Sequence, residues 1–348
     1  MKFNLVHNLE RTLRSNPSGV VLLPEGNDDR VLAAAMLCIQ NKIARCVKLF
    51  GDYDKISEVT QSDSKELFET YLAQGSLEII NPCDAKLVEQ TKLTLQKNFK
   101  TRGKAADEAY LQAKSKNSLY QAACALSRGS GNVCVSGAVH TTADVIRAGL
   151  AGVGLKGGIK SISSCFLLTR PSDNKTMMFA DCGVIIDPDT NQLVDITMST
   201  VETFKTILPE LKPVVAFLSF SSKGSAKHPR QEKVLHAFQK FQTQFPEVES
   251  EGELQFDAAF DSKVGKHKAP GSSVPGRANI FIFPDLNSGN IGYKIAQKLG
   301  GFDAYGPLLQ GFREVYSDLS RGATVNDIYT SCLISLFRWH TLNPKLQS

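Results

Sequence analysis

The 348-residue sequence lacks any apolar run of the roughly 18 to 20 residues that a helix needs to span a bilayer. Its first segment, MKFNLVHNLERTLRSNP, also lacks the apolar stretch of a signal peptide. We therefore predict a cytoplasmic protein that does not bind membranes.

Cysteine is present but never in a metal-binding arrangement. The eight cysteines are scattered, with no CxxC pair and no histidine at metal-ligand spacing. This pattern is typical of buried thiols in a reducing compartment, and it predicts no metal site.

The sequence has no long block of one charge. Its 40 Lys and Arg residues are spread among 35 Asp and Glu residues, which gives a formal net charge of +5. Nucleic acid is therefore not a predicted partner. The mild positive excess suits an anionic small-molecule substrate instead.

Several common catalytic and nucleotide motifs are also missing. The sequence contains no GxSxG, so it has no nucleophile elbow of the hydrolase kind. The stretch GVGLKGG resembles glycine-rich nucleotide loops only superficially, and we predict neither a P-loop nor a dinucleotide fingerprint.

Short apolar runs alternate with helical spacing along the whole chain. GVVLLPEG predicts a strand and DDRVLAAAMLCIQNK a helix, which together form one βα unit. The stretch 85–129 is predicted to be a helical hairpin that breaks near Gly103. The tail, from YSDLSRG onward, is predicted to be a polar loop followed by one helix. A chain of this length is expected to form two α/β lobes.

Three segments share one design, in which a strand leads through small residues into a helix start. They are VSGAVHTTAD, FIFPDLNSGNIGYK and DLSRGATVND. Exposed backbone N–H groups at such starts bind anions. Ordinary loop chemistry accounts for any one of them, but the three together favour an anionic ligand.

The segment SRGATVND is the richest of the three, and it has two interpretations. Asp327 either caps the helix with Thr324, or is a catalytic carboxylate beside the donors Ser320 and Arg321. His140 has two interpretations as well, because it can donate to an anion or only cap and pack.

Long motifs along the chain resemble one enzyme family, the phosphate acetyltransferases or phosphotransacetylases, over essentially the whole sequence. These motifs are LPEGNDDR (23–30), SGAVHTTADVIR (136–147), ADCG (180–183), KGSAK (223–227), GELQFDAA (252–259), KAPGSSVPGRANIFIFPDLNSGNIGYK (268–294), YGPLLQG (305–311) and DLSRGATVND (318–327).

The resemblance implies a fold similar to that of isocitrate and isopropylmalate dehydrogenases, with two α/β/α lobes and an interdomain cleft. Residues 1–150 and about 307–348 are expected to form the first lobe, and residues 151–306 the second. A homodimer is also implied.

The resemblance further implies reversible transfer of an acetyl group between coenzyme A and phosphate, with no metal and no tightly bound cofactor. Coenzyme A, acetyl-CoA, acetyl phosphate and phosphate are the expected small-molecule substrates. By this resemblance Asp327 is the base that takes the thiol proton, and Ser320 and Arg321 are the catalytic donors. The implied substrate-binding residues are Arg147, His140, Thr141, Thr142, Asn287, Ser288 and Gly289.

The sequence departs from the family pattern at two positions. A basic residue that is common in the family falls near Phe99 here, and we expect Arg102 to replace it. Asn326 stands where an acidic residue is common beside the base.

Three alternatives remain open at this point. A phosphate butyryltransferase would differ in the volume of its acyl pocket. A non-catalytic acetyl-CoA sensor would use the same fold without turnover, and an NAD-linked decarboxylating dehydrogenase would share the fold alone.

Overall fold

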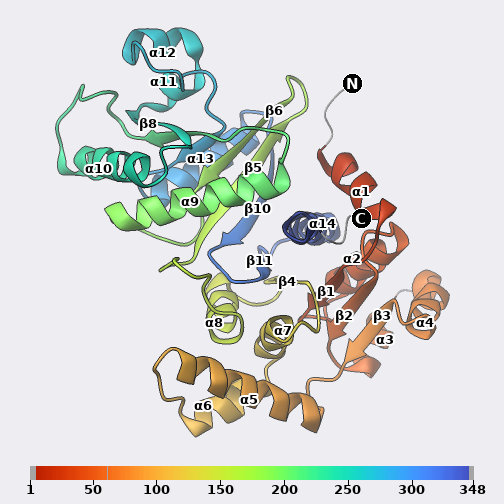
Figure 1. The fold of residues 1–348 in the computed structure, drawn as a ribbon. Helices are drawn as coiled ribbons and strands as arrows, with labels where there is room; N and C mark the ends of the chain where they lie inside the picture. The colour runs from red at the N-terminus through yellow and green to blue at the C-terminus, as the bar shows by residue number, and fades with distance from the viewer. Residues whose placement is uncertain (1–4, 61, 345–348) are drawn as a thin grey trace. The chain divides into compact units, whose positions relative to one another are not determined.

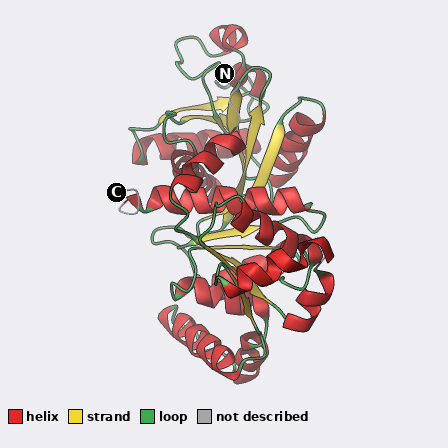
Figure 2. Cartoon of the chain, turned by 90° about the vertical axis from the view of Figure 1, so that its right-hand side faces the viewer, coloured by secondary structure: helices red, strands yellow, loops and turns green. Residues whose placement is uncertain are grey.

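The structure is a computed structural model that describes residues 5–60 and 62–344. The described chain forms two compact α/β units (Figures 1 and 2). We call the unit that ends at residue 157 and resumes at 312 the first lobe, and residues 158–311 the second lobe. The predicted two-lobe α/β fold is confirmed, with lobe boundaries a few residues beyond the expected 150 and 307.

The first lobe contains five strands and nine α-helices among its described residues. The strands are β1 Val20–Leu23, β2 Cys46–Phe50, β3 Leu77–Ile80, β4 Val133–Ser136 and β11 Val315–Asp318. The helices are α1 Leu5–Ser15, α2 Asp29–Gln40, α3 Tyr53–Val59, α4 Lys65–Ala73, α5 Ala85–Thr101, α6 Glu108–Ser115, α7 Ser118–Ser127, α8 Thr142–Gly152 and α14 Val325–Leu342, with a 3-10 turn, η1, at Ser62–Ser64.

All five strands of the first lobe are parallel and follow the order β11-β4-β1-β2-β3. Strands β1 and β4 are buried along their whole length, as expected for a parallel sheet covered by helices on both faces. Since the strands are parallel, their carboxyl ends meet at one edge, where such folds bind ligands. The loops that follow β1, β4 and β11 therefore lie next to one another.

The second lobe is built on a mixed six-stranded sheet with the order β10-β5-β6-β9-β7-β8. Its strands are β5 Ser163–Arg170, β6 Lys175–Ala180, β7 Val214–Leu218, β8 Glu249–Leu254, β9 Ile280–Ile282 and β10 Asp303–Gln310. Its helices are α9 Thr190–Ile207, α10 Pro229–Gln244, α11 Phe256–Phe260, α12 Ser262–Lys268 and α13 Leu286–Lys298.

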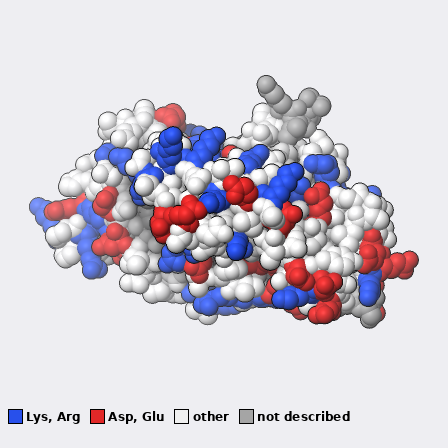
Figure 3. Space-filling view, turned by 90° about the horizontal axis from the view of Figure 1, so that it is seen from below, with Lys and Arg blue, Asp and Glu red and all other residues white. Residues whose placement is uncertain are grey.

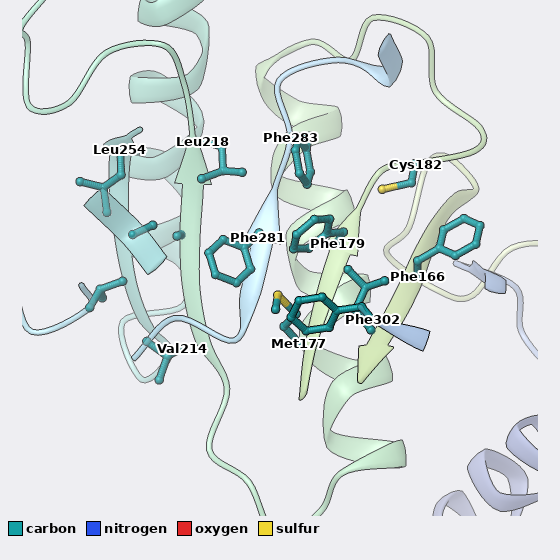
Figure 4. Packing of buried hydrophobic residues seen from close by; sticks show 14 of the residues in the cluster. Phe166, Met177, Phe179, Cys182, Val214, Leu218, Leu254, Phe281, Phe283 and Phe302 are labelled. Atoms are coloured by element: carbon teal, nitrogen blue, oxygen red, sulfur yellow. The ribbon is translucent and has the colours of Figure 1, made fainter. Parts of the chain in front are cut away.

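Aromatic side chains fill the core on one side of the second sheet (Figure 4). The Phe179 ring lies edge-on to Phe281, with the ring centroids 5.4 Å apart, and its centroid is 5.0 Å from that of Phe283. Such pairs add about 0.5–1.5 kcal/mol beyond the burial of their area. These neighbouring strands therefore form a rigid base for the loops at their ends.

Two features of the surface bear on the predicted partners. Within residues 5–60 and 62–344, no helix is both long and apolar enough to cross a membrane. On the face drawn in Figure 3, Lys and Arg side chains are interspersed with Asp and Glu side chains.

The structure differs from the sequence-based expectations in three places. The stretch 85–129 forms three helices, α5, α6 and α7, because Asp107 and Asn117 each cap a new helix start. The tail does not begin as a loop, since β11 joins the first sheet beside β4. Strands β8 and β10 were not predicted, because DAYGPLLQ and ESEGEL contain the glycine, proline and charged residues that usually disfavour strands.

Helix α13 approaches the segment after β6 closely enough that only glycine fits at position 289. A Cβ atom there would overlap the Asp181 carbonyl oxygen and lie 3.3 Å from Cys182 Sγ. The Asn290 side chain donates to the Cys182 carbonyl oxygen at 3.0 Å, which fixes the same contact. The start of α13 is therefore held against the loop that begins at Asp181.

We predict that Gly289→Ala destabilises the protein by about 1–3 kcal/mol, because the added methyl group forces the backbone apart. Denaturant unfolding measures the effect. Gly157→Ala is the matched control, since a Cβ at Gly157 meets no atom within 4 Å and the change should be nearly neutral. If the two variants were equally stable, α13 would not approach the Asp181 carbonyl oxygen closely enough to exclude a methyl group at position 289.

Candidate active site

A buried carboxylate organises the loop after β4. Glu25 follows β1 directly and is 7% exposed. Its Oε2 atom accepts backbone N–H bonds from Gly137 and Ala138 at 2.9 and 2.8 Å, and its Oε1 atom accepts from Val139 and His140, both at 3.0 Å. Four amides of one predicted anion-binding loop are thus occupied by a side chain of the protein itself.

From the sequence, we expect the amides at the start of the following helix to bind an anion. Glu25 occupies the one of them that belongs to His140, together with the three amides before it. The amides of Thr141, Thr142 and Ala143, at the start of α8, have no partner among the described residues. Any ligand that binds here would meet the helix start and the side chains, and not the turn before it.

Glu25 also holds the imidazole of His140, whose Nδ1 atom lies 2.7 Å from Glu25 Oε1. Burial pushes the pKa of Glu25 up, but the hydrogen bonds from the His140 ring and from the amides of His140, Val139 and Ala138 outweigh it and lower that pKa. The bond to Glu25 raises the pKa of His140. Nδ1 therefore donates to Glu25, and Nε2 remains for another partner.

Asp318, the last residue of β11, touches the same loop from the other side. It is 1% exposed, and its Oδ2 atom accepts from the Thr142 hydroxyl at 2.6 Å. Its Oδ1 atom has no hydrogen-bond partner among the described residues. Burial raises the pKa of Asp318 to about 7, the Thr142 hydroxyl and the Leu319 backbone N–H lower it in part, and the charge on Glu25 raises it further.

Arg30 ties the loop after β4 to the loop after β11. Its Nη1 atom donates to the carbonyl oxygens of Arg321 and Ala323 at 3.0 and 2.9 Å, and its Nη2 atom donates to the Ala138 carbonyl oxygen at 2.9 Å. Asp28 receives two further bonds from the same guanidinium. These bonds hold the loop that leads to His140 and the loop that carries Arg321 at fixed positions relative to each other.

Ser320 and Arg321 lie in the loop that leads into α14. Both are exposed, and Arg321 has no side-chain partner among the described residues. The Ser320 Oγ atom accepts from the Gly322 backbone N–H at 3.3 Å, and its own proton is free to donate elsewhere. The backbone of the loop is fixed while the Arg321 guanidinium stays available to a ligand.

Asp327 forms the helix cap that was one of its two interpretations. Its Oδ2 atom accepts from the Thr324 backbone N–H at 2.9 Å and from the Thr324 hydroxyl at 2.8 Å, and its own N–H donates to that hydroxyl. Its Oδ1 atom has no partner among the described residues, and the side chain is exposed. The cap uses one oxygen and leaves the other facing solvent.

Arg147 and Arg102 lie on other parts of the first lobe and differ in their contacts. Arg147 is one turn into α8, with its side chain 65% exposed, and it pairs with Asp144 at 2.7 Å. Such an exposed pair is worth little, so Arg147 can change partners. Arg102 donates to the Ala151 carbonyl oxygen at 3.0 Å, at the far end of α8, and its guanidinium lies near the Phe99 ring.

The predicted residues Asn287, Ser288 and Gly289 form the first turn of α13 in the second lobe. Asp285 caps this turn, because its side chain accepts from the Ser288 backbone N–H at 2.9 Å. The Ser288 hydroxyl donates back to the Asp285 carbonyl oxygen at 2.8 Å. At this helix start, the Asp285 side chain occupies the amide of the third helical residue, and the amide of the first, Leu286, donates to the Ile186 carbonyl oxygen.

Another buried carboxylate shapes the loop before α9. Asp181 is 2% exposed, and it accepts from the Ser164 hydroxyl and from backbone N–H groups of Gly183, Val184 and Ile185. Burial raises its pKa despite these bonds, since no cationic side chain faces it.

The sequence analysis missed Glu25, Arg30, Asp181 and Asp318 as site-forming residues. One signal was present for three of them. Each carboxylate stands at or just after the buried end of a strand, where a buried acid requires several donors. For Glu25 and Asp318 the donors include groups more than 100 residues away in sequence, which sequence spacing does not indicate.

A cavity of about 500 Å³ opens at the carboxyl edge of the first sheet. Loops after β1, β2, β3 and β4 line it, and they include Glu25, Asp52, Lys55, Asn81 and His140. His140 is the predicted site residue that reaches this cavity. Within the described part of the chain, no group of three or more His, Cys, Asp or Glu side chains is arranged to hold a metal ion.

The glycines at 152, 154 and 157 have the spacing GxGxxG, which is found in dinucleotide sites. They follow helix α8 and precede β5, whereas a dinucleotide fingerprint joins a strand to a helix. The structural context of such a site is therefore absent at this run.

Comparison with known proteins identifies similar chains over nearly the whole length. The family model described as phosphate acetyl/butaryl transferase matches residues 5–336. The phosphate acetyltransferase of Bacillus subtilis (strain 168) is 38% identical over 315 residues, which cover 90% of this chain and 93% of the relative. That of Thermoanaerobacterium thermosaccharolyticum is 36% identical over 329 residues, which cover 93% and 96%.

Solved structures give the same result for the fold. A phosphotransacetylase from Streptococcus pyogenes has a TM-score of 0.86 at 36% identity and covers 96% of this chain and 98% of its own. A 4-hydroxythreonine-4-phosphate dehydrogenase from Burkholderia phymatum has a TM-score of 0.52 at 13% identity, over 94% of this chain and 99% of its own. The latter likeness shows the fold alone and agrees with the expected dehydrogenase-like architecture.

We predict that Glu25→Gln lowers stability by about 3 kcal/mol or more, because the carboxamide places an N–H group against the loop amides. The His140 pKa should fall towards its ordinary value in the same variant. Denaturant unfolding and NMR titration of the imidazole measure the two effects.

The matched control is Glu78→Gln, since Glu78 forms an exposed pair with Lys48. That change should cost less than about 1 kcal/mol. Because the folded pKa of Glu25 is lowered, its stabilisation is present at neutral pH and disappears as pH falls through that pKa. Unchanged stability of Glu25→Gln across this range would contradict the assignment.

Proposed function

Because the chain belongs to the phosphate acetyl/butaryl transferase family, we propose that it transfers an acetyl group reversibly between coenzyme A and phosphate. The observation that carries this proposal is the family match over residues 5–336, combined with an unpartnered Arg321 in a fixed loop. The acetyl group passes directly from one substrate to the other while both are bound.

Asp327 is the proposed base for the coenzyme A thiol. A free thiol with a pKa near 8.5 is mostly protonated at neutral pH, and a nearby carboxylate can remove its proton. The cap with Thr324 fixes Oδ2 and leaves Oδ1 without a partner among the described residues, which supports this role. Capping and catalysis are compatible here, because they use different oxygens.

Arg321 and Ser320 are the proposed donors to the transferred group. The thiolate attacks the acetyl carbonyl carbon, the bond to the phosphate oxygen breaks, and phosphate leaves with the electron pair. Negative charge grows on the carbonyl oxygen and then on the phosphate, where a planar guanidinium and a hydroxyl stabilise it. The Arg30 bond to the Arg321 carbonyl oxygen supports a fixed position for these donors.

We propose that His140, Thr141, Thr142 and Arg147 bind the anionic parts of the substrates. The raised pKa of His140 favours the imidazolium, so Nε2 can donate to an anion. The role of Arg102 is less supported, because the Ala151 carbonyl oxygen and the Phe99 ring already engage it. For Asn287, Ser288 and Gly289, substrate binding stays a prediction.

Coenzyme A is a substrate in this proposal, and no tightly bound cofactor takes part. A cytoplasmic location is supported by eight cysteines that form no disulfide within the described residues, seven of them buried. The family description also covers butyryl transfer, so the acyl range of the protein requires assays with both acyl phosphates.

We predict that the protein rapidly forms a thioester from acetyl phosphate and coenzyme A. The absorbance of the thioester measures this reaction. Arg321→Ala should reduce kcat by about 100-fold or more through loss of a charge-stabilising donor. Asp327→Asn should reduce it by about 100-fold or more through loss of the base.

Thr324→Ala is the control that separates capping from catalysis. It removes the cap hydroxyl at a cost of about 1 kcal/mol but keeps the Asp327 carboxylate. Turnover should stay near that of the unmodified protein while the melting temperature falls. If Asp327→Asn and Thr324→Ala both kept turnover, Asp327 would be a cap only, and a wild-type protein that bound acetyl-CoA without turnover would be a sensor.

We also propose that the protein is a homodimer and that α13 contributes to the contact. Ile291, Ile295 and Leu299 recur every four residues along this helix, and they are 56%, 53% and 85% exposed. Apolar side chains at this spacing form one stripe on the helix surface. A stripe of this kind supports burial against a second copy of the chain.

Replacement of Leu299 by Asp should shift the protein from dimer to monomer, because a charge in an apolar contact is not solvated there. Sedimentation velocity measures the change over a range of concentrations. Lys298→Asp is the control, since it introduces the same carboxylate beside the stripe and leaves the apolar side chains in place. A monomeric wild-type protein, or a Leu299→Asp dimer of unchanged affinity, would refute this contact.

A further inference from the structure

We propose that Asp318 is a positioning residue whose protonation decides whether the Thr142 hydroxyl donates to the phosphate of acetyl phosphate. The inference rests on the proposed function and deepens it, because it assigns a hydrogen-bond direction within the phosphate-binding residues. It concerns a carboxyl group that neither the sequence analysis nor the proposed reaction uses.

The position of Asp318 allows almost no alternative partner. The residue ends β11, two positions before Ser320, and its carboxyl group packs against the turn at Gly137. A Cβ at Gly137 would overlap Asp318 Oδ1 and lie 2.8 Å from the Leu319 backbone nitrogen. Gly137 also has a φ of +109°, which disfavours any other residue. The carboxyl group therefore stays in contact with Thr142.

A hydroxyl group has one proton, so its direction matters. When Asp318 is ionised, both of its oxygens can only accept, and the Thr142 proton must point at Oδ2. Thr142 then offers only lone pairs to a phosphate, which repel it. When Asp318 is protonated, the carboxyl group donates to Thr142 Oγ1, and the Thr142 proton is free to bind the phosphate.

The surroundings of Asp318 favour the protonated form more than those of an ordinary aspartate. Its Oδ1 atom is buried and unpartnered, which is costly for a carboxylate and less so for a neutral acid. Glu25 lies across the same loop and contributes negative charge. Tyr316 on β11 and Cys134 on β4 also face this region, and both are buried and neutral at physiological pH.

The positive groups near Asp318 are engaged with other partners. His140 is bonded to Glu25 on the far side of the loop, and Arg30 is bonded to Asp28 and to carbonyl oxygens. Asp318 therefore titrates with a pKa of about 7, within the working range of a cytoplasmic enzyme. Thr142 is half-buried at the helix start, so a ligand can reach its hydroxyl.

The expected consequence is a KM for acetyl phosphate that depends on pH. If the protonated form is the one that binds, the apparent KM is the intrinsic value divided by the protonated fraction. With a pKa of about 7, this fraction falls about tenfold between pH 6 and pH 8, so KM should rise about tenfold over that range.

Asp318→Asn tests this directly, because its amide group donates permanently to Thr142 Oγ1 and resembles the protonated acid. Its KM for acetyl phosphate should stay near the pH 6 value of the wild type up to pH 8. Titration of acetyl phosphate itself affects the KM profiles of the wild type and of Asp318→Asn equally, so it cancels when the two are compared. Asp173→Asn is the control, since Asp173 is an exposed partner of Arg170, and it should keep the wild-type profile.

Thr142 variants provide a second test in case Asp318→Asn does not fold. Thr142→Ser should retain the rise in KM, whereas Thr142→Val should give a high KM at every pH. A wild-type KM that is flat between pH 6 and pH 8 would overturn the proposal, as would an unchanged rise in a folded Asp318→Asn protein. A wild-type protein that forms no thioester at any pH would instead refute the proposed function.

Discussion

The arrangement of the first lobe's site depends on one buried carboxylate. Glu25 receives four consecutive backbone amides and an imidazole, so the loop after β4 cannot move without breaking five hydrogen bonds to a buried carboxylate. A buried group that is left unpaired costs about 1–3 kcal/mol. The position of His140, and of the start of α8 that follows it, is therefore set by a residue on a different strand.

The second lobe uses the same device twice. Asp181 orders the loop after β6, and Glu253 accepts from the Ser221 hydroxyl and the Gly224 backbone N–H. In each case a buried acid near the end of a strand organises a loop, which is its own loop for Asp181 and the loop after β7 for Glu253. Rigid loops of this kind keep catalytic groups in place before the substrate arrives, which removes part of the cost of ordering them during the reaction.

Much of this architecture could be predicted from the sequence, and the remainder has a physical explanation. Apolar runs indicated β1 and β4, capping patterns indicated the starts of α8 and α14, and family motifs indicated the two-lobe fold. The contact of Glu25 with the amides at 137–140 was not predicted, because residues more than 100 positions apart in sequence show no sign of being adjacent in space. Strand β11 was missed because it is stable only beside β4.

Glu25 and Asp318, the two carboxylates that flank the loop after β4, differ in their pKa values, and their hydrogen-bond partners explain the difference. Glu25 is ionised because five donors surround it. For Asp318, burial raises the pKa most, the bonds from Thr142 and the Leu319 backbone N–H lower it, and the negative charge on Glu25 raises it further. One acid therefore stays charged, and the other titrates near neutrality. The charged acid fixes the backbone, and the titrating one controls a hydroxyl that the backbone presents. A single loop thus combines a rigid frame with one proton that can move.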